Sequence, residues 1–171
     1  YFTIHTEPAR LAGEEYLVHE TLNGERNAWI YTPGLRRVRR APTLAYDNPS
    51  SGYEGLATND QLYMFNGRLD RYDWKLLGKK EVFISYNNYA FASSAHRVRD
   101  LTKKNFPNRD LVRYELHRVW VVEANLKPGI RHLLPRRVFY IDEDSWRVVA
   151  TDIYDSQGAL WRYQEETTVN A

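Results

Sequence analysis

Apolar and polar side chains alternate along four short runs in the second half of the chain. These runs cover residues 114–124, 132–142, 146–154 and 160–169. Alternation with a period of two is typical of β-strands that turn one face toward a core. Residues that favour turns separate the runs, at 127–129, 142–145 and 155–158. The pattern predicts an antiparallel meander of four strands.

The first forty residues show a similar pattern with shorter runs. Strands are predicted over residues 1–6, 15–22, 26–31 and 35–40. Asn23-Gly24 is a strong hairpin signal, because both residues tolerate the positive φ values that a two-residue turn requires. Thr32-Pro33-Gly34 marks the next corner. Residues 1–40 are therefore predicted to form a second antiparallel meander.

A loop and a short helix are predicted after this meander. Residues 41–55 are rich in Pro, Gly, Asn and Ser, so we expect an extended loop there. Residues 58–60 then offer helix-capping side chains, and Leu62, Phe65 and Leu69 follow at helical spacing. This combination predicts a short helix.

The rest of the middle segment has no clear period. Residues 72–88 leave helix and strand both open, and residues 90–109 are expected to be loop with one or two helical turns. A segment of such length without regular structure is commonly a functional cover or lid. We therefore expect residues 41–112 to cover the sheet that the two meanders form.

Composition favours one globular β domain. Of 171 residues, 43% are hydrophobic and 14% aromatic, with 13 Tyr and 5 Trp, which argues against disorder and favours strands over helices. The length fits a single domain. The chain starts at Tyr1 rather than Met, and predicted strands lie close to both ends. We therefore expect a fragment of a longer chain.

Several function classes are excluded or disfavoured by residue content. A net charge of +2 is too small for a nucleic-acid partner, and the lack of Cys excludes disulfides, Cys zinc sites and thiol catalysis. There is no glycine-rich phosphate loop, nucleophile elbow or paired-His metalloprotease motif. We therefore expect no enzyme. An enzyme acting on a lipid or glycan is the remaining alternative, with His117 or Glu115 as its catalytic group.

The sequence predicts no metal site and no cofactor. The spacings of the five His residues do not predict that they converge on one metal ion. These residues are His5, His19, His96, His117 and His132. The acidic corner at residues 142–144 lacks the spaced oxygen ligands of a dedicated calcium loop, so we interpret it as a turn, with weak calcium binding as the alternative.

Basic residues are concentrated at two places. In a strand over residues 36–40, Arg37 and Arg39 share one face, where they would protect a solvated sheet edge or, alternatively, bind an anionic surface. Arg118 shares a strand face with large apolar side chains, so its charge needs a partner. We expect it to stack on an aromatic ring or pair with a carboxylate such as Glu123 or Asp152. Contact with a ligand head group or a lid is the alternative.

Long strings of residues resemble an uncharacterised family of Gram-negative envelope proteins. They lie at residues 29–42, 46–49, 60, 64–67, 70–76, 78–81, 113–123, 139–146 and 154–155, and so span nearly the whole chain. One departure is Ser85, where the family pattern has proline. The family is a domain of unknown function known as outer-membrane lipoprotein-sorting proteins, whose members are longer at both ends and begin with a secretion signal.

The resemblance implies a mainly β fold, a curved antiparallel sheet that forms a half-open β-barrel with a helix and loop cover. In the similar periplasmic carrier and outer-membrane receptor of lipoproteins, such a sheet holds acyl chains. It implies a module of the periplasm or the inner face of the outer membrane that binds a lipid or other hydrophobic ligand, in lipoprotein sorting or envelope transport. The candidate lining residues are Trp29, Tyr31, Trp120, Val122, Phe139 and Ile141.

A structural or adaptor domain is the alternative to a lipid carrier. Such a domain would dock on an envelope exporter or porin through exposed strand edges and the basic strand at residues 36–40. It would bind its protein partner in a charge-dependent way and take up no lipid.

Overall fold

The computed structural model describes residues 1–21, 26–41, 46–50, 53–104 and 106–169. It divides into two compact units, Tyr1–Asn59 and Asp60–Ala171, and each is described by itself. The prediction of a single domain stays a prediction. No described helix has the length and apolar character that crossing a membrane requires.

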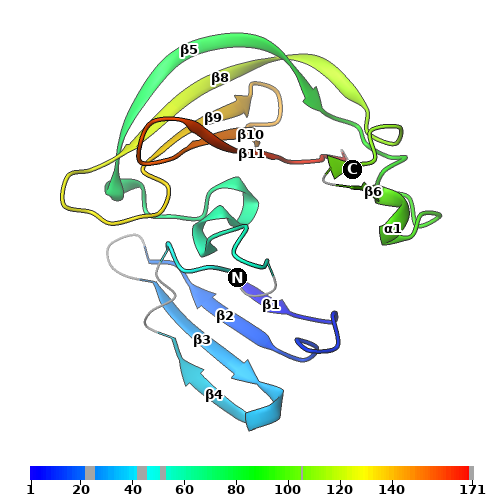
Figure 1. Ribbon diagram of the computed structural model, residues 1–171, viewed down its shortest axis with the longest axis vertical. Coiled ribbons are helices and arrows are strands. Elements are labelled where there is room, and N and C mark those ends of the chain that lie inside the picture. The colour runs from blue at the N-terminus through cyan, green and yellow to red at the C-terminus, as the bar shows by residue number, and fades with distance from the viewer. Residues whose placement is uncertain (22–25, 42–45, 51–52, 105, 170–171) are drawn as a thin grey trace. The chain divides into compact units, whose positions relative to one another are not determined.

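The first unit contains, within its described residues, a four-stranded antiparallel sheet in the order β1-β2-β3-β4. The strands are β1 Phe2–Ile4, β2 Glu15–His19, β3 Asn27–Thr32 and β4 Arg37–Arg40. This confirms the predicted meander (Figure 1). The Asn23-Gly24 hairpin signal lies outside the described residues.

Turn chemistry explains the last hairpin of this sheet. The single-turn 3₁₀ helix η1 Pro33–Leu35 joins β3 to β4, and Pro33 supplies the fixed φ that starts a turn. Arg36 closes it in the left-handed region, with φ 48°. Val18 and Ala28 form the buried part of the sheet, whereas all of β4 is exposed.

The second unit is built on a five-stranded antiparallel sheet in the order β11-β10-β9-β8-β5, as far as it is described. Its strands are β5 Tyr72–Ser85, β8 Tyr114–Leu126, β9 Arg136–Asp142, β10 Val148–Tyr154 and β11 Leu160–Glu165. The four predicted strands of the second meander are confirmed as β8 to β11. β5 and β8 are the long arched strands in Figure 1.

β5 is the main departure from the predicted middle segment. Residues 72–85 belong to the sheet and pair with β8 along its whole length, so they are no part of a cover. The alternation of apolar and polar residues in β5 is hard to recognise because a bulge at Leu77 shifts the register. In addition, Lys79, Lys80 and Glu81 lie on an exposed edge strand. A strand with charges on both faces does not alternate clearly.

The predicted helix around Phe65 is also corrected. Asn59–Met64 forms the 3₁₀ segment η2, interrupted by extended dihedrals at Leu62 and a positive φ of 52° at Tyr63, and Leu69–Arg71 forms the single turn η3. The apolar spacing instead reflects a non-helical segment that folds onto the sheet. Asp60, expected as a cap, is buried in an ion pair.

Residues 86–113 contain little regular structure. They include the short helix α1 Val98–Leu101 and the two-residue strands β6 Thr102–Lys103 and β7 Phe106–Pro107, which pair with each other. This matches the expected loop with one helical turn. The buried amide of Asn88 anchors the start of this segment, because its side chain hydrogen-bonds Ser85 Oγ at 2.9 Å and its N–H donates to the carbonyl of Thr168 at 3.0 Å.

The five-stranded sheet has two distinct faces. One, here called the valine face, carries the buried cluster Ile84, Val119, Val121, Val138 and Val149. The other, here called the aromatic face, carries Tyr72, Ala124 and Phe139 with Phe65 packed against them. Successive side chains of a strand point to opposite faces, which is why Val138 and Phe139 separate.

The valine face is the concave one. Ile84 lies on β5 and Val149 on β10, with β8 and β9 between those strands in the sheet, yet both belong to one buried cluster. Residues of β5 and β10 also approach within 8 Å between Cα atoms and line one cavity through Val82, Ile84 and Val149, which requires that the sheet curve toward this face. The arch of β5 and β8 over the other strands is visible in Figure 1. A ligand bound inside the curve would therefore meet valine-face residues.

Candidate functional site

A cavity of about 190 Å³ opens on the valine face. Its apolar lining comes from β5 and β10, at Val82, Phe83, Ile84, Val149 and Ala150. The cavity lies where β5 and β10 come close to each other on this face. It is smaller than the roughly 300 Å³ at which pockets for whole drug-sized molecules begin, so it accommodates one segment of a larger apolar ligand.

Four polar side chains line the same cavity: Tyr140, Asp152, Tyr163 and Glu165. The Tyr140 hydroxyl donates to Asp152 Oδ2 at 2.8 Å. Burial, together with nearby carboxylates, raises the pKa of Tyr163 to about 12. Burial also raises the pKa of Glu165 above its usual value, although a hydrogen bond from Tyr114 acts against this. The cavity thus combines apolar walls with acidic and phenolic groups.

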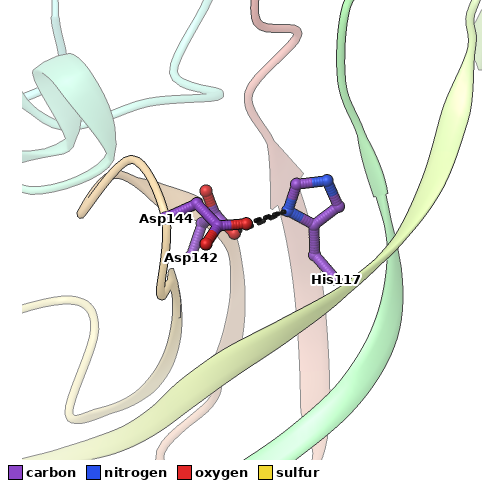
Figure 2. Close-up of side chains that lie close together, drawn as sticks. All are labelled: His117, Asp142 and Asp144. Carbon is purple, nitrogen blue, oxygen red and sulfur yellow. Dashed lines mark hydrogen bonds and ion pairs between the residues drawn. The ribbon is translucent and has the colours of Figure 1, made fainter.

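A second cluster of polar groups lies on the same face, where β8 meets the turn between β9 and β10. His117 Nδ1 lies 2.8 Å from Asp142 Oδ1 and 3.5 Å from Asp144 Oδ2. Figure 2 shows both carboxylates beside the imidazole ring. The register places them together, because Val82 pairs with His117 and Val119 pairs with Asp142. The three ligand atoms lie within 4.8 Å of one another, as a small metal site requires.

Asp142 is fully buried and its negative charge is held by hydrogen bonds. Its Oδ2 accepts from the N–H of Ser145 at 2.9 Å and from the Ser145 hydroxyl at 2.6 Å. Burial acts to raise the pKa of Asp142, but the bonds from Ser145 and the neighbouring His117 outweigh it and lower that pKa. Among the described residues, no side-chain nitrogen of Lys or Arg lies within 4.0 Å of a carboxylate oxygen of Asp142 or Asp144.

A third cluster is buried against the aromatic face and has a different character. Arg137, with no exposed surface, donates to Asp60 Oδ2 at 2.6 Å and to the Tyr72 hydroxyl at 2.5 Å. His132 Nε2 lies 3.2 Å from the same carboxylate oxygen. Leu134 N–H donates to His132 Nδ1, so the ring proton is on Nε2. Nε2 lies near Asp60 but has no hydrogen-bond partner among the described residues. The cluster ties the η2 segment to β9.

Aromatic rings surround this ion pair. The guanidinium carbon of Arg137 lies 5.1 Å from the Phe65 ring centroid and 5.0 Å from that of Tyr72. Burial acts to raise the pKa of Asp60, but His132 and Arg137 outweigh it and lower that pKa from 3.8 to about 2. The charge of Arg137 is therefore balanced by a carboxylate and two rings, although its Nε and Nη1 have no hydrogen-bond partner among the described residues. A charge pair balanced in this way fits a structural role.

Four of the six candidate lining residues come together on the aromatic face. Val122 pairs with Phe139 and Trp120 pairs with Ile141 in the β8–β9 register. Phe65 of the η2–η3 segment packs edge-on against Phe139, with 5.5 Å between ring centroids. This face is therefore occupied by the chain itself, and the cavity lies on the opposite face. The other two, on β3, are half-buried in the first unit; they are Trp29 and Tyr31.

The basic candidates lie on exposed surfaces. Arg118 Nε donates to Glu143 Oε2 at 2.5 Å, so the expected carboxylate partner exists but is neither Glu123 nor Asp152. Arg37 and Arg39 are exposed on β4, which pairs only with β3 among the described strands. A role of these three residues in ligand or surface binding stays a prediction.

The residues of the valine-face cavity were missed from the sequence because both sides of each strand carry apolar groups. Phe139 and Ile141 were chosen as lining, whereas their neighbour Tyr140 faces the cavity. One signal was available: Asp152 and Glu165 interrupt apolar strands, and a carboxylate at such a position needs a reason. Nothing in the sequence pairs His117 with Asp142, since this depends on the β8–β9 register.

Comparison with known proteins identifies relatives of this chain. A family model described as "Protein of unknown function (DUF1329)" matches residues 1–171. The uncharacterised protein PA3922 from Pseudomonas aeruginosa is 53% identical over 163 residues, which are 94% of this chain and 36% of that protein. The chain therefore spans about a third of this curated relative.

Two solved structures share the fold. A domain provisionally described as an outer membrane lipoprotein-sorting protein, from Vibrio parahaemolyticus, matches with a TM-score of 0.57 at 21% identity, over 93% of this chain and 52% of that one. A family protein from Desulfovibrio piger matches with a TM-score of 0.58 at 19% identity, over 95% and 54%. These matches confirm the predicted fold class, a mainly β chain whose antiparallel sheets are not closed.

Proposed function

Because this chain belongs to the DUF1329 family of proteins of unknown function, and shares its fold with a lipoprotein-sorting protein domain, we propose that it binds an apolar ligand noncovalently. The proposed ligand is an acyl chain of a lipid or lipoprotein. The proposed location is the periplasm or the inner face of the outer membrane of a Gram-negative bacterium. The role is binding and transfer, not catalysis.

The observation that carries this proposal is the valine-face cavity. A concave sheet with apolar walls removes methylene groups from water, which stabilises a bound chain by about 0.8 kcal/mol per methylene. Tyr140 and Asp152 bond to each other at the cavity, and this leaves the apolar walls Val82 and Val149 available for the chain. Their acidic character favours an uncharged acyl segment or a cationic head group over a free carboxylate.

A cavity-filling substitution tests the proposal. Ala150→Leu adds three carbon atoms at the cavity wall, so it displaces about three methylenes of ligand. At about 0.8 kcal/mol each this weakens binding about fiftyfold. The measurement is titration of the 171-residue chain with cis-parinaric acid, a fluorescent fatty acid, and with its methyl ester, because the acidic lining disfavours the free acid.

Ala159→Leu is the matched control, because Ala159 is exposed in the turn between β10 and β11 and does not line the cavity. It should bind the probes as the wild type does. A second pair avoids any packing strain: Tyr163, 58% exposed, lines the cavity, whereas Leu160, 59% exposed on the same strand, does not. Binding that responds equally to Tyr163→Ala and Leu160→Ala, or no probe binding by the wild type, contradicts the proposal.

Docking on an envelope protein is the second candidate, and one observation favours it. β4 is an exposed edge strand that carries Arg37, Arg39 and Arg40, and none of its four residues is buried. An acidic partner surface would bind there in a salt-dependent way. Arg37→Glu with Arg39→Glu should then abolish capture of an outer-membrane or exporter partner by the chain while leaving cis-parinaric acid binding unchanged. Unchanged capture by this double variant contradicts the docking role.

A further inference from the structure

The His117 cluster presents one nitrogen and two oxygen ligands from two different elements. His117 projects from β8, and Asp142 and Asp144 flank Glu143 at the turn that follows β9 (Figure 2). Glu143 points to the opposite side, where it pairs with Arg118 and Lys79. Alternation along the turn therefore directs two carboxylates, and no third, at the imidazole.

The charges around this cluster are unbalanced. Asp142 is fully buried, and a second carboxylate, that of Asp144, lies 3.5 Å from the same ring nitrogen. Lys79 and Arg118 bond to Glu143 instead, and within the described part of the chain no Lys or Arg side chain pairs with the carboxylate of Asp142 or Asp144. Two carboxylates facing one imidazole without a permanent cation form an arrangement that a bound cation completes.

The surroundings hold the two inner ligands in place. Ser145 binds Asp142 Oδ2 through its N–H and its hydroxyl, which leaves Oδ1 directed at His117. The His117 ring packs on Tyr86, with 4.3 Å between ring centroids. Ligand side chains in metal sites are typically oriented by such outer contacts. Ligand atoms around a tetrahedral ion of this kind lie roughly 3.4 Å apart. Asp144 Oδ2 is 3.5 Å from His117 Nδ1 and its side chain is 77% exposed, so it already meets this spacing. Asp142 Oδ1, at 2.8 Å, must move slightly away from His117 Nδ1 when an ion binds.

We propose that His117 Nδ1, Asp142 Oδ1 and Asp144 Oδ2 bind one divalent transition metal ion of the Zn²⁺ type. An imidazole nitrogen with two carboxylate oxygens suits Zn²⁺ and its neighbours, whereas Ca²⁺ and Mg²⁺ prefer oxygen ligands alone. Three protein ligands leave a coordination position open on the side of exposed Asp144. The site departs from the expectation that this chain holds no metal, and it is independent of acyl-chain binding in the cavity.

Isothermal titration of the metal-free 171-residue chain with Zn²⁺ tests the site. The wild type should bind one equivalent. Asp144→Asn should weaken binding at least about tenfold, because removal of a ligand costs no less than removal of an outer contact. This side chain is exposed, so the variant keeps the fold. His117→Gln should remove the binding event, and Mg²⁺ in tenfold excess should not compete.

Asp110→Asn is the matched control, because Asp110 is also 77% exposed and pairs only with Lys103 in the described residues. His19→Gln controls for adventitious binding to a surface imidazole. Both should bind Zn²⁺ within twofold of the wild type. The proposal is overturned if the wild type binds no Zn²⁺, if Asp144→Asn and Asp110→Asn weaken binding equally, or if Mg²⁺ displaces the ion.

Discussion

Two aspartates of the second unit are buried beside a histidine, but they are compensated in different ways. Asp60, against the aromatic face, pairs with the guanidinium of Arg137 and lies 3.2 Å from His132. Asp142, on the valine face, has His117 at 2.8 Å, and the second group on that histidine is another carboxylate, Asp144. One buried charge therefore has a permanent cation, and the other has hydrogen bonds and an imidazole.

The difference separates a structural ion pair from a candidate site. Arg137 and Asp60 balance each other's charge among aromatic rings, and their pairing links the η2 segment to β9. The Asp142 cluster opens to solvent through Asp144 and has an uncompensated carboxylate. A buried charge that already has an opposite charge beside it needs no ligand, whereas carboxylates without one, close to the surface, are a candidate binding site.

The largest effect is expected from removing the cation at Asp60. Arg137→Met removes the permanent cation beside a buried carboxylate and should lower the free energy of unfolding by about 3–5 kcal/mol. Urea unfolding followed by tryptophan fluorescence measures it. The double variant Asp60→Asn with Arg137→Met should lose less than Arg137→Met alone, since no unpaired charge remains. A double variant that is the less stable of the two refutes this account.

A smaller loss is expected on the valine face. In the metal-free chain, Asp142→Ala leaves the Ser145 N–H, the Ser145 hydroxyl and His117 without their acceptor. Unsatisfied groups of this kind cost about 1–3 kcal/mol, so we expect a loss of about 3 kcal/mol in urea unfolding. Asp155→Ala removes an acceptor of two backbone N–H groups in an exposed turn and is the control. Equal losses of unfolding free energy in the two variants would show that the burial of Asp142 does not increase the cost of losing its hydrogen bonds.

The next largest effect is expected in acid, where the fold should lose the stability that ionised Asp60 contributes. The pKa of Asp60 is lowered from 3.8 to about 2 in the folded chain, so its ionised form stabilises the fold at pH values above 3.8. That contribution, about 2 kcal/mol by the size of the shift, is lost as the pH falls through about 2. The stability gap between wild type and Asp60→Asn should therefore narrow by this amount in acid-dependent urea unfolding. A gap that is independent of pH contradicts the assignment.

The smallest effect is expected from the side chain that supports Asp142. Ser145→Ala removes one hydroxyl hydrogen bond of 2.6 Å and keeps the bond from the N–H of residue 145. The loss should be about 1 kcal/mol, the usual net value of one such bond. Ser145→Thr keeps the hydroxyl and should retain more stability than Ser145→Ala in thermal unfolding. If both substitutions cost the same, the hydroxyl is not what holds the carboxylate.

Sequence reasoning succeeded where local pattern and local structure coincide. The strands β8 to β11 and the four strands of the first unit follow from period-two alternation and from turns built by Pro and Gly. It failed at β5, where Lys79 to Glu81 interrupt the pattern on an edge strand, and at η2, where helical spacing of apolar residues accompanies positive φ at Tyr63. In both segments, contacts with the sheet outweigh the secondary structure that the local sequence favours.

The candidate site was predictable only in part. Apolar lining was expected on β8 and β9, and Trp120 and Phe139 do lie together, but on the face that Phe65 covers. His117 and the acidic corner were each noticed and were interpreted separately. They are 25 residues apart in sequence and 2.8 Å apart in space, and only the pairing of Val119 with Asp142 brings them together.

By itself the sequence determined the antiparallel meanders, their turns and the family to which the chain belongs. The tertiary structure alone decided which face of the sheet is concave and that a fifth strand extends it. It also decided that, among the described residues, a permanent cation pairs with Asp60 but not with Asp142. The physical reason is that the alternation of side chains separates each strand into two faces but does not tell which of them is concave. Curvature and cross-strand register arise from the packing of all the strands together, so they assign Val149 and Asp142 to the inside and Phe139 to the covered outside.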